Sequence, residues 1–205
     1  ADLDPATRQA AASELLTQSS PEALNILAQS LTSGKTAQVT AVLSAIEGEI
    51  QPDPTLQSAA IKAMANVPPG NRATLGGLLV RYSETNPDIF GIVSSKATDS
   101  ESPLAERESA IACLGEFHTQ PAQAARVLVD ILQQDPSRVL AIAAGNSLSQ
   151  LTGLPSNWET NRWLAWWEIN QNRASNLWLR DAIQAQGRRI TDLEAQLRQA
   201  KERDR

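Results

Sequence analysis

Apolar residues recur along this chain in short segments with the spacing of an α-helix, and the segments themselves recur at a regular distance. Starting from Arg8, Val39, Arg72, Arg107 and Ala141, the residues three, four and seven positions further on are small or aliphatic. These starting positions are 31, 33, 35 and 34 residues apart. A repeat of this length with two helices per unit is typical of an α-solenoid, in which stacked units bury a continuous core.

The same spacing predicts eleven helices, separated by Pro, Gly, Ser and Asp. The expected ranges are 5–17, 21–32, 35–50, 54–66, 71–83, 87–97, 103–117, 121–134, 136–151, 158–171 and 173–203. Most starts place Asp, Ser or Asn directly before Pro, which caps a helix without losing a hydrogen bond. Asp135-Pro136 is one such start, and Gly34 and Gly153 follow helix ends, where a positive φ is favoured. The chain is therefore expected to be all-α.

Parts of the chain resemble HEAT repeats. Residues 4–11 and 103–115 resemble the first helix of that repeat, with a proline opening, an Arg and a seam of small residues. Residues 148–153, followed by a Trp-rich segment, resemble the terminal unit of bacterial HEAT-repeat proteins. The resemblance covers about residues 4–170, although Val39 and Ala141 replace the Arg. It implies a HEAT-like α-solenoid of about five helix pairs over residues 1–171, followed by a long C-terminal helix over 172–205.

The composition narrows the functions that such a chain can have. Among 205 residues there is one cysteine, Cys113, and one histidine, His118, so an intrachain disulfide and a Cys- or His-rich metal site are excluded. Residues 1–170 hold 10 basic and 18 acidic side chains, whereas residues 171–205 hold 8 basic and 5 acidic ones. The net negative charge of residues 1–170 repels the phosphate backbone of nucleic acid, so no nucleic-acid partner is expected. No stretch reaches the roughly 20 apolar residues of a membrane span. The composition does not indicate a compartment.

The tryptophans form the most conspicuous cluster in the sequence. All five lie between positions 158 and 178, and Trp163, Trp166 and Trp167 fall on one face of a predicted helix. They could form an aromatic platform for a partner. The favoured interpretation is a terminal cap, because the last repeat must cover an apolar face that has no further neighbour.

Other residue types that carry chemistry have simpler interpretations. His118 is expected in the last turn of the seventh helix, and Cys113 is expected to be a half-buried, inert thiol. The acidic positions are expected to form a solvated helix face; they are Glu101, Glu106, Glu108 and Glu116. Gly76-Gly77 lacks the residues of a phosphate loop and predicts a close helix contact or a kink. No catalytic residue, metal site or cofactor is predicted.

The C-terminal segment carries a heptad pattern of apolar residues. Ile183, Ile190 and Leu197 are seven positions apart, and Leu193 lies between them. The rest of that pattern consists of Leu179, Gln186 and Ala200, with Gly187 as its weak point. The pattern favours a coiled coil and a homodimer. The alternative is a helix that first packs on the repeats through Trp178 and Leu179.

Together these features predict a non-catalytic scaffold that binds a protein partner. The binding face is expected on the second helices of the pairs, at 21–32, 54–66, 87–97 and 121–134. One alternative is a DNA-handling HEAT protein, since HEAT-like glycosylases use Trp and a carboxylate, for which Trp163, Trp167 and Glu168 are the matching residue types. Another alternative is a HEAT-like lyase or chaperone that acts on another protein; the fold resemblance permits it, but no residue of the sequence indicates it.

Overall fold

A computed structural model describes residues 4–49, 52–178, 180–181, 183–184 and 187. These residues are predominantly helical, and no strand occurs among them, so the chain is all-α as the sequence predicts. The helices are α1 (Pro5–Gln18), α2 (Pro21–Leu31), α3 (Thr36–Glu47), η1 (Pro54–Leu56), α4 (Gln57–Ala63), η2 (Pro69–Asn71), α5 (Arg72–Thr85), α6 (Asp88–Thr98), α7 (Leu104–Leu114), α8 (Pro121–Gln134), α9 (Arg138–Thr152) and α10 (Thr160–Asn170). The elements η1 and η2 are single 3-10 turns.

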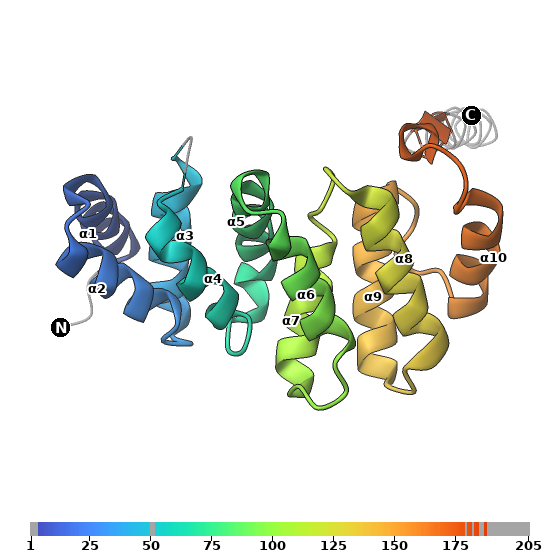
Figure 1. Ribbon diagram of the computed structural model, residues 1–205, viewed down its shortest axis with the longest axis horizontal. Helices are drawn as coiled ribbons and strands as arrows, with labels where there is room; N and C mark the ends of the chain where they lie inside the picture. Colours follow the sequence, from blue (N-terminus) through green and yellow to red (C-terminus); the bar gives the residue numbers. More distant parts are fainter. Residues whose placement is uncertain (1–3, 50–51, 179, 182, 185–186, 188–205) are drawn as a thin grey trace, which may run out of the picture.

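The helices form an elongated row with α1 at one end and α10 at the other (Figure 1). The odd-numbered helices α1, α3, α5, α7 and α9 contact one another in sequence along the row. The even-numbered helices lie beside them in a second layer, where α2 contacts α4 and α6 contacts α8. Because the chain alternates between the two layers, side chains about one repeat apart in sequence become neighbours.

Hydrogen bonds between successive pairs hold this arrangement together. The Asn71 amide donates to Thr40 Oγ1 at 2.9 Å, and the Ser147 hydroxyl donates to the Ile111 carbonyl at 2.9 Å. The Arg81 guanidinium donates to the Ile46 carbonyl, at the last turn of α3, at 3.2 Å. These partners are 31, 36 and 35 positions apart, which is the spacing of the sequence repeat.

The core between the layers is built mainly from Leu, Ile, Val and Ala. Small residues let the odd-numbered helices approach closely. A Cβ on Gly76 of α5 would lie 2.7 Å from Glu116 Cγ and 2.9 Å from Cys113 Cα, so this glycine is required by the close contact with α7. Gly76 therefore makes the close helix contact that the sequence suggests, whereas a Cβ on Gly77 would meet nothing within 4 Å.

Several predicted helix ends are confirmed by their caps. The side chains of Asp4 and Ser20 accept hydrogen bonds from the Thr7 and Ala23 amides. Gly34 and Gly153 have φ values of 68° and 72°. The predicted start at Asp135-Pro136 is wrong: α9 begins at Arg138 and Ser137 caps it. The Asp135 carboxylate accepts from the Ser137 amide and pairs with Arg107 instead.

Several other predicted helices are shorter than expected. Helix α3 ends at Glu47 rather than 50, and α10 spans Thr160–Asn170 rather than 158–171. The range 54–66 begins with the turn η1, and α4 ends at Ala63, because the Val67-Pro68-Pro69 segment that follows cannot continue a helix. Helix α7 ends at Leu114 rather than 117. His118 therefore lies beyond the helix in an exposed turn, and its expected place in the last helical turn is wrong.

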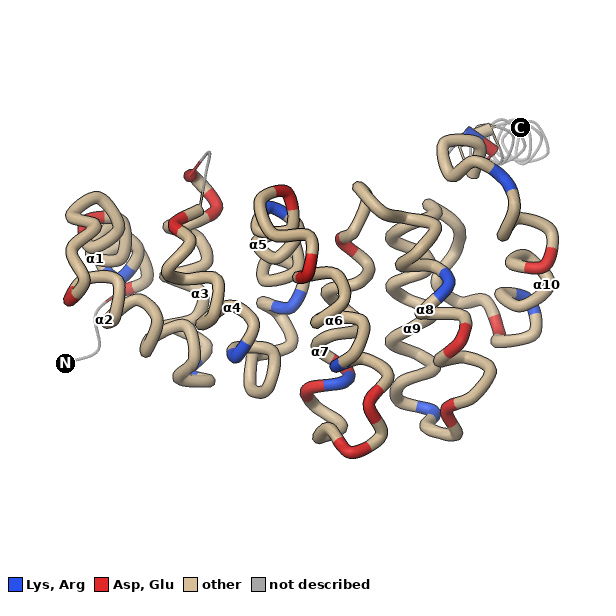
Figure 2. The backbone as a smooth tube through the Cα atoms, in the orientation of Figure 1, with Lys and Arg blue, Asp and Glu red and all other residues tan. Residues whose placement is uncertain are grey.

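The acidic residues in and around α7 do not form the solvated face that the sequence suggests. Glu106 is buried and pairs with Lys96 of α6, while Glu108 pairs with Arg72 of α5. Glu116 accepts a hydrogen bond from the Gln150 amide, and Glu101 alone of the four is exposed. Figure 2 shows acidic and basic residues side by side where α6 leads into α7. Their positions between helices let them pair across repeats, which a one-dimensional pattern does not reveal.

After α10 the chain turns, and the described residues from 175 onward are helical again. Arg173 donates to Asn170 Oδ1 at 2.6 Å and to the Asp181 carboxylate at 2.8 Å, so it joins α10 to this segment. No helix within the described part of the chain is long and apolar enough to cross a membrane.

Candidate interaction surface

The outer face of the odd-numbered layer is hollowed near its C-terminal end. One hollow of about 340 Å³ crosses α5, α7 and α9, and its walls include Ala73, Ala112 and Ile142. A second hollow of about 480 Å³ lies between α9 and the segment from Ser156 to Trp163, and Ile142 lines it too. Ile142 therefore stands on the ridge between two hollows.

Helix α9 presents large aliphatic side chains on this face. Val139 and Ile142 are 46% and 56% exposed, and Asn146 continues the same face one turn further. We refer to Arg138, Val139, Ile142, Asn146 and Trp158 as the α9 surface. Exposed aliphatic residues beside hollows are typical of sites that bind another molecule.

The walls of the first hollow are held by polar contacts between helices. Arg72 and Glu108 form a two-pronged ion pair between α5 and α7, with N–O distances of 2.8 and 3.1 Å. Gln150 of α9 donates to the Glu116 carboxylate beyond α7. Burial raises the pKa of Glu116, while the hydrogen bond from Gln150 and the nearby His118 oppose that rise. These contacts join α5 to α7 and α9 to the end of α7 around the hollow.

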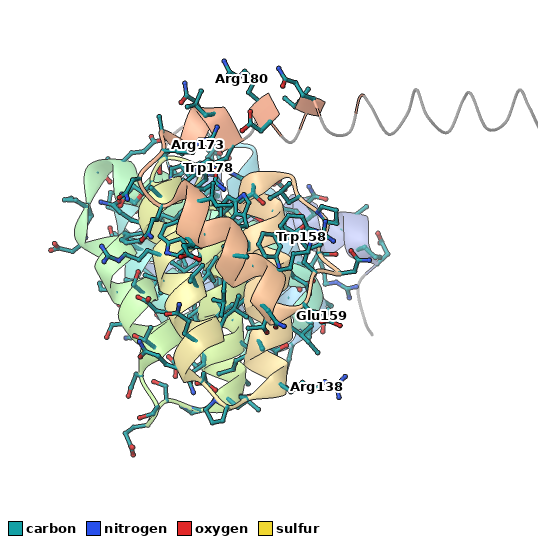
Figure 3. The ribbon with its side chains drawn as sticks, turned by 90° about the vertical axis from the view of Figure 1, so that its right-hand side faces the viewer. Arg138, Trp158, Glu159, Arg173, Trp178 and Arg180 are labelled. Atoms are coloured by element: carbon teal, nitrogen blue, oxygen red, sulfur yellow. The ribbon has the colours of Figure 1, made fainter. Side chains whose placement is uncertain are left out.

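The second hollow is bordered by aromatic rings. The Arg162 guanidinium lies 4.2 Å from the centre of the Trp158 ring, which is a cation–π contact. Trp163 is fully buried, and its indole N–H has no hydrogen-bond partner in the structure. That nitrogen lies 3.4 Å from the position that a Cβ on Gly145 would take, and both residues line the hollow. Figure 3 shows Arg138, Glu159 and Trp158 along one side of this end of the row.

The tryptophans pack mainly on one another. Ring centroids are 5.9 Å apart for Trp163 and Trp166, and 5.1 Å apart for Trp166 and Trp178. Trp178 is also buried, whereas Trp166 and Trp167 are half-buried. Trp163 thus belongs to the packed core, in the manner of a terminal cap, rather than to a surface that a partner can reach.

The residues that the DNA-handling alternative would use, Trp163, Trp167 and Glu168, do not lie together on one accessible surface. Trp167 and Glu168 line a hollow of about 540 Å³ on the even-numbered side, together with Arg126 and Asp130 of α8. Trp163 is buried on the side of α9 and does not line that hollow. Stacking of an extruded base between Trp163 and Trp167 therefore has no geometric support.

Of the heptad residues, only Ile183 lies among the residues that the structure describes. Ile183 is helical and 69% exposed. Ile190, Leu193 and Leu197 lie outside the described residues, as do Leu179, Gln186 and Ala200. The coiled coil and the homodimer that the heptad pattern favours therefore stay predictions.

The described residues offer few groups for chemistry. Cys113 is completely buried, more so than the sequence suggests, and burial raises the pKa of its thiol to about 12. Among the described residues, no three His, Cys, Asp or Glu side chains gather closely enough to hold a metal ion.

No protein family model matches this chain, and neither does a curated protein or a solved structure.

The helical periodicity of the sequence does not distinguish Val139 and Ile142 from other apolar residues, but an alignment of the five repeat units does. The residues that correspond to Ile142 in the four earlier units are Gln9, Thr40, Ala73 and Glu108. Those that correspond to Val139 are Ala6, Ala37, Gly70 and Ala105. Positions that are small or polar in four units and aliphatic in the fifth distinguish α9 from the rest of its layer.

Proposed function

We propose that this chain is a non-catalytic protein–protein interaction scaffold of the HEAT-repeat type. In this proposal the row of helix pairs is an α-solenoid of about five units, followed by a long C-terminal helix. Support comes from the elongated two-layer row and from hydrogen bonds between residues 31 to 36 positions apart. Each unit then stabilises its neighbour, and the faces of the layers remain open to a partner.

The exposed aliphatic pair Val139 and Ile142, beside two hollows, is the observation that carries this function. Exposed aliphatic residues also lie on even-numbered helices, Ile26 on α2 and Ile169 on α10, but neither lines these two hollows. The odd-numbered layer is therefore proposed as the binding face in place of the second helices of the pairs, which the repeat pattern alone suggested. The hollow between α8 and α10 in the even-numbered layer is lined by the charged residues Arg126, Asp130 and Glu168. Charged side chains at the solvated rim of an interface contribute little to binding, whereas the main anchors lie in desolvated pockets.

Chemical cross-linking in cells of the source organism, followed by affinity capture of the chain, tests the proposal. We expect one or a few proteins to be captured, and each purified partner should bind the purified chain with saturation in a calorimetric titration. Absence of any saturable protein partner contradicts the scaffold function. Tight binding of duplex or single-stranded DNA that weakens steeply with salt would favour the DNA-handling alternative.

A further inference from the structure

We propose that the hollow between α1 and α3 binds a peptide segment of a partner protein, with an aliphatic side chain of that segment in the hollow and a neighbouring Asp or Glu beside Arg8 and Lys35. This α1–α3 hollow lies at the opposite end of the row from the α9 surface and is a second, separate site (Figure 1). The inference rests on the scaffold function, since its ligand is a protein segment, and adds the site and the chemistry of that segment. An apolar floor and a basic lining lead to it.

The floor of the hollow is apolar. Its volume is about 610 Å³, which exceeds the volumes of the two hollows beside α9. Leu27 of α2 and Val42 of α3 line it and are 1% and 2% exposed, and the half-buried Leu15 of α1 lines it too. Ala12 and Ala41, which also line it, are too short to fill the space. An aliphatic side chain that enters can therefore contact these branched residues and be buried, which is a main source of affinity.

The charged residues that line the hollow are all basic. Arg8 and Lys35 line it, and no described acidic side chain does. Asp4, one helical turn before Arg8, caps α1 by accepting a hydrogen bond from the Thr7 amide and is not part of the lining. Each of the hollows beside α9, by contrast, is lined by one Arg and one Glu. On a chain whose net charge is −5, the positive lining sets the α1–α3 hollow apart and favours an anionic ligand.

The polar residues at the edge of the hollow match a carboxylate on a peptide. Lys35 is exposed and forms no ion pair with another residue of the described part of the chain. Two basic side chains line the hollow, whereas a nucleic-acid backbone needs a longer basic stripe, so a carboxylate is the better match. Ser30, Thr36 and Gln38 complete the lining with groups that can donate to and accept from a peptide backbone.

The test is selection of a phage-displayed library of random peptides on the intact chain, followed by titration of the enriched peptides. We expect a group of peptides in which an aliphatic residue stands next to Asp or Glu. Ala11→Leu should lower their affinity about tenfold or more, because the added side chain occupies the hollow in place of the ligand. Lys35→Glu should lower it about three- to tenfold at low salt and less at high salt, because a charge beside the ligand is reversed.

Matched variants outside the hollow provide the controls. Ala10→Leu places the same side chain on the preceding residue of α1, which is also exposed but does not line the hollow. Lys62→Glu reverses the charge of an exposed lysine on α4 that does not line it either. Both should leave the affinity unchanged. Because Ala11 is itself exposed, Ala11→Leu should keep the fold, which circular dichroism and the melting temperature check.

Several results would overturn the inference. Enriched peptides that bind Ala11→Leu as tightly as Ala10→Leu do not use the hollow, and enriched peptides without acidic residues contradict the ligand class. If their affinity falls with Ile142→Asp and not with Ala11→Leu, the peptides bind the α9 surface, so the scaffold function is supported and the second site is wrong. Absence of any enriched peptide also counts against the second site. In that case a saturable partner from cross-linking keeps the scaffold function, and without such a partner both fail.

Discussion

Gly76 of α5 lies against Cys113 of α7 so closely that a Cβ on the glycine would be 2.9 Å from the cysteine Cα. The same Cβ would be 2.7 Å from Glu116 Cγ. Real Cβ atoms do not come this close to a backbone atom, so the two helices can keep their spacing only with glycine at this position. The contact between α5 and α7, and with it the first hollow, therefore depends on a missing side chain.

Gly76→Ala should destabilise the fold by about 1–3 kcal/mol, because the methyl group forces α5 and α7 apart. Urea denaturation monitored by circular dichroism measures this change. Gly77→Ala is the matched control: its Cβ meets nothing within 4 Å, so alanine should leave stability unchanged or raise it by up to about 1 kcal/mol. Equal effects of the two substitutions would show that packing at Gly76 is looser than the structure indicates.

Because of the Arg107–Asp135 pair, the free energy of unfolding should decrease at acid pH. Burial by itself raises the pKa of Asp135, but the Ser137 amide and the Arg107 guanidinium outweigh it, so the pKa lies below its ordinary value. A carboxyl group whose pKa is lowered by folding stabilises the fold above its unfolded pKa of about 3.9 and loses that contribution as pH falls through the folded pKa. Arg107 also donates to the Ala97 carbonyl, so the pair joins three segments.

Asp135→Asn should accordingly lower the free energy of unfolding by about 1.5–3 kcal/mol at pH 7, since a charge-assisted hydrogen bond is weakened. The difference from the unchanged chain should be constant between about pH 5 and 8 and should shrink below about pH 4. Urea denaturation at a series of pH values checks this. A difference that persists undiminished at the lowest pH would show that the ionised carboxylate is not responsible.

Cys113 should be unreactive in the folded chain. Burial, with a smaller contribution from Glu116 and against an opposing one from Arg72, raises the pKa of its thiol to about 12. The thiolate that attacks disulfide reagents is therefore scarce at pH 8. A chromogenic disulfide reagent should react slowly in native buffer and rapidly in concentrated urea. Ser95→Cys in a Cys113→Ala background gives an exposed control on α6 that should react at once. Fast reaction of Cys113 in native buffer would show that the α5–α7 contact opens readily.

Features of the fold that depend on nearby residues could be predicted from the sequence, whereas contacts between distant residues could not. Caps and helix periods act within a few residues, which is why Asp4, Ser20, Gly34 and Gly153 could be placed correctly from the sequence. The partner of Asp135 is Arg107, 28 positions away, and that pairing displaced the predicted start of α9. The same limit applies to Glu106 and Glu108, whose partners lie on other helices.

The candidate surface was recognisable from the sequence only in part. The tryptophans mark the end of the row, but burial of Trp163 assigns that residue to packing. Ile142 becomes conspicuous only when it is aligned with Gln9, Thr40, Ala73 and Glu108 and when its exposure is known. Periodicity tells which face of a helix is apolar. It does not tell which apolar residue lies beyond the edge of the core.

The C-terminal segment leads to the last prediction, which is self-association. Ile183 is 69% exposed, and the sequence places Ile190, Leu193 and Leu197 on the same heptad stripe. Burial of one such side chain contributes about 1.5–3 kcal/mol, so these four residues are sufficient for weak dimerisation through a coiled coil. Light scattering over a range of concentrations should show a dimer for the intact chain and a monomer for a chain that ends at Asn172.

A second variant separates this outcome from a purely structural role of the segment. Truncation after Asn172 also removes Trp178, which is 3% exposed and packs on Trp166, so the shortened chain should be less stable for that reason alone. Ile183→Glu retains Trp178 and should abolish the dimer while leaving the melting temperature of the repeats unchanged. If the intact chain is monomeric and only the truncation lowers the melting temperature, the segment serves as a cap for the repeats and the dimer is ruled out.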